Sequence, residues 1–518
     1  MTEPFVMVPF QPQPFVRAWA EVLQREAAPA LWHVQAHSDA TTPWHWPTDT
    51  QATPTDALLV QRLRAACWGL LPGLHRLRLW APELGPTLTH LNLHIGAGAG
   101  ASAGVDNALP PPTPAPNAPA REARVVVIGA GLAGAACARA LAERGYRVQV
   151  LDQGAAPAAG ASGLPVGLVA PHASPDDALL SRLSRAGVRA MRDAMQRLLH
   201  EGQDWGHSGV QERRLPGKTR KGGMPAHWAQ AHPEAAADWT CPHPDPRTPA
   251  HTLWHAHGAW VRPARLVQAL LNHPGVAWQG HRPVRALRSH GGVWQIDARS
   301  ATHHASPAVI EADHVILACG PAVPTLLQAS GLTSAVPPMH ALRGQVSWGL
   351  MRDVAGALAD PRSDAPTDWP SSPVNGHGSF VHGVPSEDGP AWYAGATYDR
   401  TRHTAELLAH DHDENLERLR ALLPALATHL APAFARGQVR GWAGVRCTVP
   451  DRLPMVGRLP HTPEGLWVCS AMGSRGLTLA VLCGELLAAQ WTGEPSPIEP
   501  PLAHALRAER FAQRAIAP

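Results

Sequence analysis

The chain has 518 residues, of which 45% are hydrophobic, and a formal net charge of +3. This length exceeds one ordinary domain, so we expect two or three folded units with a large buried core. The charge balance is too weak to identify a partner, although Lys218 and Lys221 are the only lysines and almost all of the positive charge is arginine.

The sequence carries no signal for a membrane, a disulfide framework or a metal site. The first thirty residues hold no charged segment followed by an apolar one, and no stretch of about 18 uncharged apolar residues occurs. The seven cysteines are scattered without a C-x-x-C pair, and the thirty histidines form no H-E-x-x-H motif. We therefore expect a soluble, cytoplasmic protein with no membrane segment and no metal.

Residues 1–95 form a first, weakly patterned unit. A helix is predicted around residues 56–67, and the alternation of apolar and polar residues over 87–93 predicts a strand. The unit is small for an independent domain, and we interpret it as a small α+β unit.

Residues 96–121 form a linker. A flexible run of glycine and alanine is followed by a stiff run of proline. Such a segment buries too little apolar surface to offset the entropy lost when it becomes ordered. The linker therefore separates the first unit from everything that follows.

The second unit opens with the pattern of a parallel βαβ motif. An apolar, β-branched run at 125–128 predicts a strand, residues 133–144 predict a helix, and 147–151 predict a second strand. Strands that alternate with helices indicate an α/β fold with a parallel sheet.

The turn between the first strand and the helix fits the dinucleotide-binding pattern G-x-G-x-x-G. Gly129 permits the tight turn, Gly131 lets a pyrophosphate approach the backbone, and Gly134 lets the helix pack on the strand. Asp152 follows 18 residues after Gly134, where a carboxylate can accept hydrogen bonds from an adenosine ribose. On this motif alone the nucleotide is either FAD or NAD.

Three further segments favour FAD. Residues 160–163 form a turn of small residues just after the second strand, and residues 312–320 read as a buried strand that ends on small residues. A strand at 466–469 leads through a glycine-rich turn at 472–478 into a helix that runs to about residue 490. The start of that helix points its positive end at the edge of a reduced flavin, where negative charge develops.

Residues from all these segments are candidate cofactor contacts. They are Gly129, Gly131, Leu132, Ala133, Gly134, Asp152, Gly160, Ala161, Ser162, Val284, Ala318, Gly320, Gly473, Ser474, Arg475, Gly476 and Leu477.

At these motifs the sequence resembles the D-amino-acid oxidase and glycine oxidase superfamily. Residues 444–457 (GVRCTVPDRLPMVG) and 471–477 (AMGSRGL) are more closely similar to the oxidoreductase half of the bifunctional tRNA 5-methylaminomethyl-2-thiouridine biosynthesis proteins, MnmC. Residues 258–263, 343–346 and 394–398 also resemble that family. The resemblance runs from about residue 123 to 492.

The resemblance implies a fold and a domain plan. We expect a Rossmann-like FAD-binding domain of the glutathione-reductase type, interleaved with a substrate domain built on an antiparallel sheet. The FAD-binding segments would be mainly 122–200, 255–330 and 440–492, the substrate segments 200–255 and 335–440, and residues 496–518 a C-terminal tail.

The other half of that family is an N-terminal methyltransferase that uses S-adenosylmethionine. Residues 68–95 look like a piece of it, but the glycine-rich cofactor loop and the aspartate-containing FLDGFAP-type segment are missing. We therefore expect residues 1–95 to be a degenerate remnant without methyltransferase activity. A second departure is residues 163–167 (GLPVG), where the family carries a polar G-N-R-x-G stretch.

The resemblance also implies an activity. The family's substrate is a tRNA wobble uridine with a carboxymethylaminomethyl group, which is oxidised at the amine to release glyoxylate, with oxygen as the expected electron acceptor. Arg446 and Arg475 are the candidates for binding the substrate carboxylate, because the guanidinium group can donate two parallel hydrogen bonds. Tyr398 is a candidate for the same pocket. For each of the three, a purely structural role remains an alternative.

Residues 213–221 hold five cations and are a candidate contact for tRNA phosphates, with an ordinary solvated loop as the alternative. Two other functions remain open because a fold does not fix its substrate. One is a small-molecule amine or amino-acid oxidase, and the other is a non-catalytic tRNA-binding protein on a flavin fold.

Overall fold

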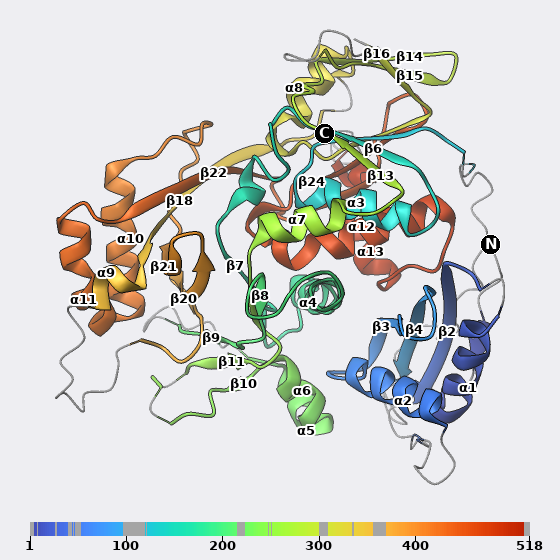
Figure 1. The fold of residues 1–518 in the computed structure, drawn as a ribbon, viewed down its shortest axis with the longest axis horizontal. Coiled ribbons are helices and arrows are strands. Elements are labelled where there is room, and N and C mark those ends of the chain that lie inside the picture. The colour runs from blue at the N-terminus through green and yellow to red at the C-terminus, as the bar shows by residue number, and fades with distance from the viewer. Residues whose placement is uncertain are drawn as a thin grey trace.

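The computed structural model describes residues 5–96 and 120–511, except residues 8, 26–27, 40–43, 45, 47–52, 121, 215–222, 247, 250, 300–308, 334–335 and 356–368. Most of the predicted linker therefore lies outside the described residues. We call residues 5–96 the N-terminal unit and residues 122–511 the C-terminal unit. In Figure 1 the N-terminal unit, in blue, lies beside the helices at the centre of the C-terminal unit.

The N-terminal unit is a four-stranded sheet in the order β1-β2-β4-β3. Strands β1, β2 and β4 are parallel, and β3 is antiparallel to β4. Its elements are β1 (Phe5–Met7), α1 (Pro12–Leu23), β2 (Leu31–Asp39), α2 (Pro54–Ala66), β3 (Gly73–Trp80) and β4 (Leu88–Gly96). The predicted helix and the predicted strand of this unit are both confirmed, as α2 and β4.

Helices α1 and α2 cover one face of this sheet. Alternate strand residues such as Val34, Leu77 and Leu91 are fully or almost fully buried and share one apolar cluster with Phe15 and Leu63 from the two helices. Because successive side chains of a strand point to opposite faces, the residues between them point to the other face. That other face is directed at the C-terminal unit.

The C-terminal unit is built around a six-stranded sheet in the order β13-β6-β5-β17-β24-β23. Its strands are parallel except β23, which is antiparallel to β24. The strands are β5 (Val125–Ile128), β6 (Val148–Leu151), β13 (Val276–Gln279), β17 (His314–Leu317), β23 (Met455–Arg458) and β24 (Leu466–Ser470). This sheet confirms the predicted βαβ motif and the α/β fold.

The long helix α12 (Gly476–Thr492) lies against α3 (Leu132–Ala142) and α4 (Leu179–Leu198). Two glycines allow this approach. A Cβ atom on Gly484 would lie 2.7 Å from the backbone of Ala136, and one on Gly187 would lie 2.2 Å from the carbonyl oxygen of Thr478. Helix α12 therefore has almost every side chain buried.

Shorter elements surround the central sheet. Two three-stranded sheets have the orders β7-β12-β8 and β14-β15-β16. The elements are η1 (Ala161–Gly163), β7 (Gly167–Val169), β8 (Trp205–Gly206), α5 (Ala226–Ala231), α6 (Pro233–Trp239), β12 (Ala259–Val261), α7 (Pro263–Leu271), β14 (Ala286–His290), β15 (Val293–Asp297), β16 (Val309–Ala312), η2 (Gly320–Ala322) and α8 (Val323–Ala329).

An eight-stranded sheet, in the order β10-β11-β9-β19-β20-β21-β18-β22, forms the other large layer. All its neighbouring strands are antiparallel except β19 and β9. Its elements are β9 (Val210–Glu212), β10 (Cys241–Pro242), β11 (Leu253–His255), β18 (His340–Leu350), β19 (Val374–Gly376), β20 (Gly378–Ser386), β21 (Gly389–Gly395) and β22 (Arg440–Thr448), with α9 (Met351–Ala355), α10 (Ala409–Leu422) and α11 (Pro424–Ala435) packed beside it (Figure 1).

Two boundaries differ from the sequence analysis. We had grouped residues 440–448 with the FAD-binding segments, but β22 pairs along its whole length with β18 in the eight-stranded sheet. Residues 496–511, which belong to the predicted C-terminal tail of 496–518, contain α13 (Pro500–Leu506) and η5 (Ala508–Phe511). The reason is apolar burial, because Ile498, Leu502 and Leu506 are at most 5% exposed.

Within the described residues, no helix is long and apolar enough to cross a membrane. The part of the chain that the structure describes also contains no group of three or more His, Cys, Asp or Glu residues that could hold a metal ion.

Candidate active site

Of the three glycines of the predicted dinucleotide motif, Gly129 follows β5, Gly131 is the N-cap of α3 and Gly134 lies in the first turn of α3. No larger residue fits at Gly129 or Gly134. A Cβ atom on Gly134 would lie 1.9 Å from the carbonyl oxygen of Gly129. Gly129 has a φ of +110°, and a Cβ there would lie 2.6 Å from the carbonyl oxygen of Ala318. The turn therefore depends on bare backbone, as close approach of a pyrophosphate requires.

Asp152 lies at the end of β6, beside this turn. Its carboxylate accepts hydrogen bonds from the backbone N–H of Ala130, at 2.6 Å, and of Gly154, at 2.7 Å. Each carboxylate oxygen can accept a further bond, so the contact that we expect with the ribose remains compatible with this geometry. Asp152 also has a role that sequence reasoning missed, which is to fix the glycine turn.

The turn at residues 160–163 meets the start of α3. The backbone N–H of Leu132 donates a hydrogen bond of 2.9 Å to Ser162 Oγ. The β17 strand ends in the same region, because Ala318 N–H donates to the carbonyl of Ile128. Cβ atoms on Gly160 and Gly320 would meet no atom within 4 Å. Bare backbone that borders open space is what a dinucleotide needs, so these residues fit FAD.

The glycine-rich turn before α12 lies close to the start of α3. A Cβ atom on Gly476 would lie 3.6 Å from the side chain of Leu132, so the first residues of the two helices meet. Leu477 packs over Gly167, where a Cβ would lie 2.3 Å from it. The expected candidates Leu132, Ala133, Ala161 and Val284 are all partly or fully buried around the same turns. The structure thus brings the N-terminal and C-terminal cofactor motifs together.

Arg446 lies on β22 and reaches the turn before α12. Its guanidinium donates to Ser474 Oγ at 3.1 Å and to the carbonyl oxygen of Thr397 at 3.5 Å. The same group lies 4.8 Å from the centre of the Tyr398 ring, whose residue is 49% exposed. No carboxylate of the described residues contacts Arg446, so its positive charge is available to an anionic substrate.

Arg475 lies directly before α12 and interacts electrostatically with Tyr398. Burial, followed by the neighbouring charge of Arg452, lowers the pKa of Arg475 below its ordinary value. Among the described residues it has no carboxylate partner either. Arg446, Tyr398 and Arg475 therefore form one cationic and aromatic corner at the edge of the expected flavin position.

A buried polar network stabilises the segment that contributes Tyr398 to this corner. Arg343 is fully buried on β18, and it contacts the Asp411 carboxylate at 2.6 Å and Gln345 Oε1 at 2.9 Å. Gln345 in turn receives a hydrogen bond from Leu408 N–H at 2.9 Å and donates its backbone N–H to Thr397 Oγ1 at 3.0 Å. The network holds the segment that carries Tyr398 against β18.

Sequence reasoning missed two features of β22 and its neighbour. A Cβ atom on Gly344 would lie 2.3 Å from the Arg446 guanidinium, so only glycine lets Arg446 lie flat over β18. Trp442 covers Gly444 and lies 3.7 Å from the Cβ position of Gly163. The spacing of 442, 444 and 446, which places all three on one face of a strand, was the signal that could have revealed them.

The candidate RNA contact is only partly described, because residues 215–222 lie outside the described residues. Arg213 donates to the carbonyl oxygen of Leu422, and Arg214 forms an ion pair of 2.9 Å with Glu212. These two arginines are thus engaged within the protein. The other three cations of the cluster stay untested as phosphate contacts.

A family model described as FAD-dependent oxidoreductase (DAO) matches residues 124–490. The protein of Polaromonas naphthalenivorans named "tRNA 5-methylaminomethyl-2-thiouridine biosynthesis bifunctional protein MnmC" is 46% identical over 389 residues, which cover 73% of this chain and 58% of the relative. A relative of the same name from Paracidovorax citrulli is 47% identical over 75% of this chain and 60% of its own length. The chain therefore spans about three fifths of these relatives, and the resemblance noted in the sequence is confirmed.

Solved structures share the fold at low sequence identity. L-proline dehydrogenase from P. horikoshii has a TM-score of 0.56 at 14% identity, and the match covers 76% of this chain and 98% of that one. Glycine oxidase from Bacillus cereus has a TM-score of 0.52 at 17% identity, covering 72% and 95%. With the two cofactor motifs brought together and most of the chain matched by the family model, this protein belongs to the DAO family of FAD-dependent oxidoreductases, with FAD as cofactor.

Proposed function

We propose that this protein oxidises the carboxymethylaminomethyl group of a wobble uridine in tRNA to an aminomethyl group and releases glyoxylate. The observation that carries the proposal is the corner formed by Arg446, Tyr398 and Arg475, in which two cations without carboxylate partners among the described residues face one site. The carboxymethylaminomethyl group is an N-substituted glycine, so it presents one carboxylate. The names of the relatives support tRNA as the carrier of that group.

The residues of the site would perform three tasks. Arg446, held by Ser474 and Thr397, binds the substrate carboxylate through parallel hydrogen bonds. Arg475 adds a second positive charge, and burial of its guanidinium strengthens that interaction because less water screens it. Tyr398 packs against the Arg446 guanidinium and limits its movement. Together they orient the amine for reaction, which is the main contribution of the protein in a cofactor enzyme.

The reaction balances as a two-electron oxidation followed by hydrolysis. FAD, when bound, accepts the hydride of the carbon next to the carboxylate, and the amine nitrogen loses its proton, so that a carbon–nitrogen double bond forms. Water adds to that carbon and the bond to nitrogen breaks, which gives glyoxylate and the aminomethyl uridine. Oxygen is the proposed acceptor that returns the cofactor to its oxidised form.

The N-terminal unit supports no methyl transfer in this proposal. The turn between β1 and α1 contains no glycine, and Phe10 in that turn is fully buried. An S-adenosylmethionine site at such a turn needs open backbone for the methionine group. We therefore propose that the unit is a degenerate remnant of a methyltransferase, and that a separate enzyme methylates the product.

The decisive experiment offers the purified protein two kinds of substrate. We expect the visible flavin band to bleach without oxygen, and glyoxylate to form, with tRNA that carries the carboxymethylaminomethyl group. Turnover of glycine, sarcosine or D-amino acids without turnover of the tRNA would instead identify a small-molecule oxidase. Protein that takes up no FAD and bleaches with neither substrate would identify a non-catalytic tRNA-binding protein.

A genetic test is independent of purification. We expect the bulk tRNA of a deletion strain to accumulate the carboxymethylaminomethyl nucleoside, measured by nucleoside chromatography and mass spectrometry. An unchanged nucleoside profile would exclude the proposed substrate.

A further inference from the structure

The face of the N-terminal sheet that is not covered by α1 and α2 carries rows of polar side chains across its strands. His33 on β2 stands opposite His90 on β4, and Arg78 on β3 is the next member of that row. Arg76 and Asn92 form part of the neighbouring row, joined by a hydrogen bond of 2.8 Å from Arg76 Nε to Asn92 Oδ1. All five side chains are buried or nearly so, because this face packs on the C-terminal unit.

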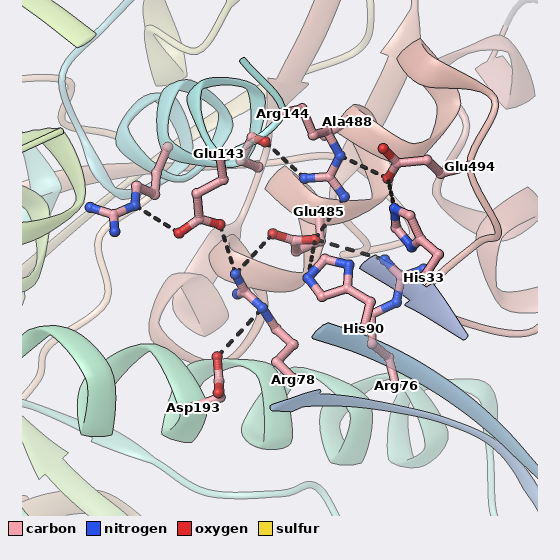
Figure 2. A network of polar contacts seen from close by, with 12 residues as sticks. His33, Arg76, Arg78, His90, Glu143, Arg144, Asp193, Glu485, Ala488 and Glu494 are labelled. Atoms are coloured by element: carbon pink, nitrogen blue, oxygen red, sulfur yellow. Dashed lines mark hydrogen bonds and ion pairs between the residues drawn. The ribbon is translucent and has the colours of Figure 1, made fainter. Parts of the chain in front are cut away.

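Arg78 lies at the centre of the contact. Figure 2 shows its guanidinium between three carboxylates of the C-terminal unit, from Glu143, Glu485 and Asp193. The nitrogen–oxygen distances are 2.8 Å, 3.4 Å and 3.5 Å respectively, and the Arg78 side chain is only 4% exposed. Burial alone would lower the pKa of Arg78, but the charges of Glu485, Glu143 and Asp193 raise it above its ordinary value. A buried arginine that contacts three carboxylates keeps its positive charge.

Arg76 and the two histidines extend the contact toward the C-terminal end of α12. Arg76 donates to the carbonyl oxygen of Pro495 at 2.5 Å and lies 3.7 Å from Glu485. His33 Nε2 lies 3.2 Å from Glu494, as Figure 2 shows. Both of these carboxylates also contact Arg144 of the C-terminal unit.

The C-terminal unit does not balance this cluster by itself. Among the described residues of the network, it supplies four carboxylates, Glu143, Asp193, Glu485 and Glu494, and three arginines, Arg139, Arg144 and Arg197. The N-terminal unit supplies Arg76 and Arg78, neither of which pairs with a carboxylate of its own unit among the described residues. Since unpaired charges are costly to bury, each unit needs the other for its buried charges.

A second contact lies next to the charged one. Gly69, at a φ of +57°, passes so close to Trp239 that a Cβ atom would lie 2.6 Å from the indole nitrogen. Its N–H donates to Asp238 at 2.7 Å, and its carbonyl accepts from Trp239 Nε1 at 2.8 Å. Arg189 of α4 donates to the carbonyl of Ala66 at 2.8 Å, and Leu71 is buried in the main apolar cluster of the C-terminal unit. Residues 66–78, which include the beginning of the segment that resembles a methyltransferase, therefore make these contacts.

The charged contact involves the two helices whose first residues border the expected cofactor site. Glu485 is on α12, and the same helix begins one residue after Arg475 at the site. Glu143 caps the end of α3, whose first residues border the dinucleotide turn. Helices α3 and α12 thus meet with their first residues at the proposed FAD position. Each has a carboxylate at or toward its other end, Glu143 or Glu485, that contacts Arg78.

We propose that the N-terminal unit is a structural domain that stays permanently docked on the oxidoreductase. Its sheet presents Arg76 and Arg78, which neutralise carboxylates on and beside α3 and α12. In this way the N-terminal unit maintains the FAD site. This role requires no methyl donor and does not depend on which amine the enzyme oxidises. It gives the remnant a function in the protein as it exists.

The first test uses the full chain with a protease site placed within residues 97–119. After cleavage, we expect the two fragments to elute together in gel filtration with FAD bound, and with the spectrum and activity of the uncut protein. Fragments that separate at neutral pH while the larger one keeps FAD and full activity would overturn the proposal.

The second test removes one charge from the interface. In the uncut chain, Arg78→Met removes the one counter-charge that Glu143, Glu485 and Asp193 share, so we expect the midpoint of thermal FAD release to fall by about 5 °C or more. The matched control is Arg62→Met, which breaks the exposed pair with Glu83 inside the N-terminal unit and should leave the midpoint unchanged. Equal midpoints for Arg78→Met and Arg62→Met would overturn the proposal.

The third test separates charge pairing from general damage. If Arg78 acts by neutralising Glu485, adding Glu485→Gln to Arg78→Met removes one uncompensated charge, and the double variant should lose less than the sum of the two single losses. Additive losses would mean that Arg78 acts through the folding of its own unit. If Arg78→Met yields no soluble protein, the cleaved wild-type chain is tested in 1 M salt instead. Salt screens buried ion pairs much less than exposed ones, so the two fragments should still elute together.

Discussion

Each unit contains a turn that joins a parallel strand to a helix, and the two turns are built in opposite ways. Where β5 leads into α3, Gly129 before the helix and Gly134 in its first turn keep the backbone bare, and the first N–H groups of the helix border the expected cofactor position. Between β1 and α1, Phe10 is fully buried, and Pro12 and Pro14 lie in the first turn of the helix, so two of its first N–H groups are missing. The same topology therefore permits ligand binding in one unit and core packing in the other.

The arginines of the two units also differ, in whether they have carboxylate partners. Arg446 and Arg475 in the C-terminal unit have no carboxylate partner among the described residues and face the candidate site. Arg76 and Arg78 in the N-terminal unit are buried against carboxylates. The comparison teaches that the partners of a charged side chain, rather than its presence, separate a binding role from a structural one.

The largest expected effect comes from filling the open turn. Gly134→Ala places a Cβ atom 1.9 Å from the carbonyl oxygen of Gly129, which the backbone cannot relieve without moving α3 from β5. We expect protein without bound FAD, measured by the flavin absorbance of the purified sample. Gly160→Ala, where a Cβ meets no protein atom within 4 Å, is the matched control and should fold while binding FAD more weakly. A yellow, stable Gly134→Ala protein would contradict the assignment of the turn.

The next effect concerns the cations of the candidate site. Arg446→Met removes charge-assisted hydrogen bonds worth about 1.5–3 kcal/mol, so kcat/KM should fall about 10- to 150-fold. Arg446→Lys should recover part of this loss, because a lysine keeps the charge but not the two parallel donors. The control is Arg440→Met on the same strand, where an exposed pair with Asp388 is broken and kcat/KM should stay as in the wild type. A normal kcat/KM for Arg446→Met would assign Arg446 a structural role.

A smaller effect on stability is expected when the pH is lowered. It arises from a buried histidine of the N-terminal unit. Burial, followed by the charges of Arg76, Arg78, His33 and Arg144, lowers the pKa of His90 well below its ordinary value. Glu485 lies 3.9 Å away but does not reverse that direction.

The sign of the pH effect follows from this direction. Between the lowered pKa and about 6.5 the unfolded chain binds a proton that the folded chain does not, so stability falls as the pH falls through this window, by about 1.4 kcal/mol per pH unit. We expect the unfolding midpoint to drop from pH 7 to pH 5.5, measured by fluorescence, and to drop less in His90→Gln. The same slope in the variant would place the acid sensitivity elsewhere.

The last prediction is a ligand that leaves the unfolding midpoint unchanged. S-adenosylmethionine should leave the unfolding midpoint unchanged, because the filled turn offers it no site, whereas a bound ligand at 100 times its Kd would add about 2.7 kcal/mol of stability. FAD added to partly depleted protein is the positive control. A rise in the midpoint with S-adenosylmethionine would overturn the interpretation of the N-terminal unit as a remnant.

The local features of the cofactor site could be predicted from the sequence. Gly129, Gly131 and Gly134 are close in the chain to the strand and the helix that they join, so their spacing alone carried the prediction. The strand pairings that bring residues 446 and 475 beside that turn could not be read from patterns. They were expected only through the resemblance to a known family.

The interface between the units was not predicted at all. Arg78 and Glu143 are 65 residues apart in sequence and Arg76 and Pro495 are 419 apart, and no periodic pattern reports such contacts. The polar residues at 76, 78, 90 and 92 alternate with apolar ones along their strands. Alternation gives the faces of a sheet but does not say what covers each face.

The sequence positions of Arg78 and Glu485 also matter while the chain is being made. Arg78 leaves the ribosome early and Glu485 near the end, a delay of roughly 20 to 80 s at common rates of synthesis. Throughout that time the docking face of the nascent sheet lacks Glu485 and Glu494 as partners. Because this face carries arginine, histidine and asparagine instead of leucine, water can hydrate it, and the early unit can wait for its partner without aggregating.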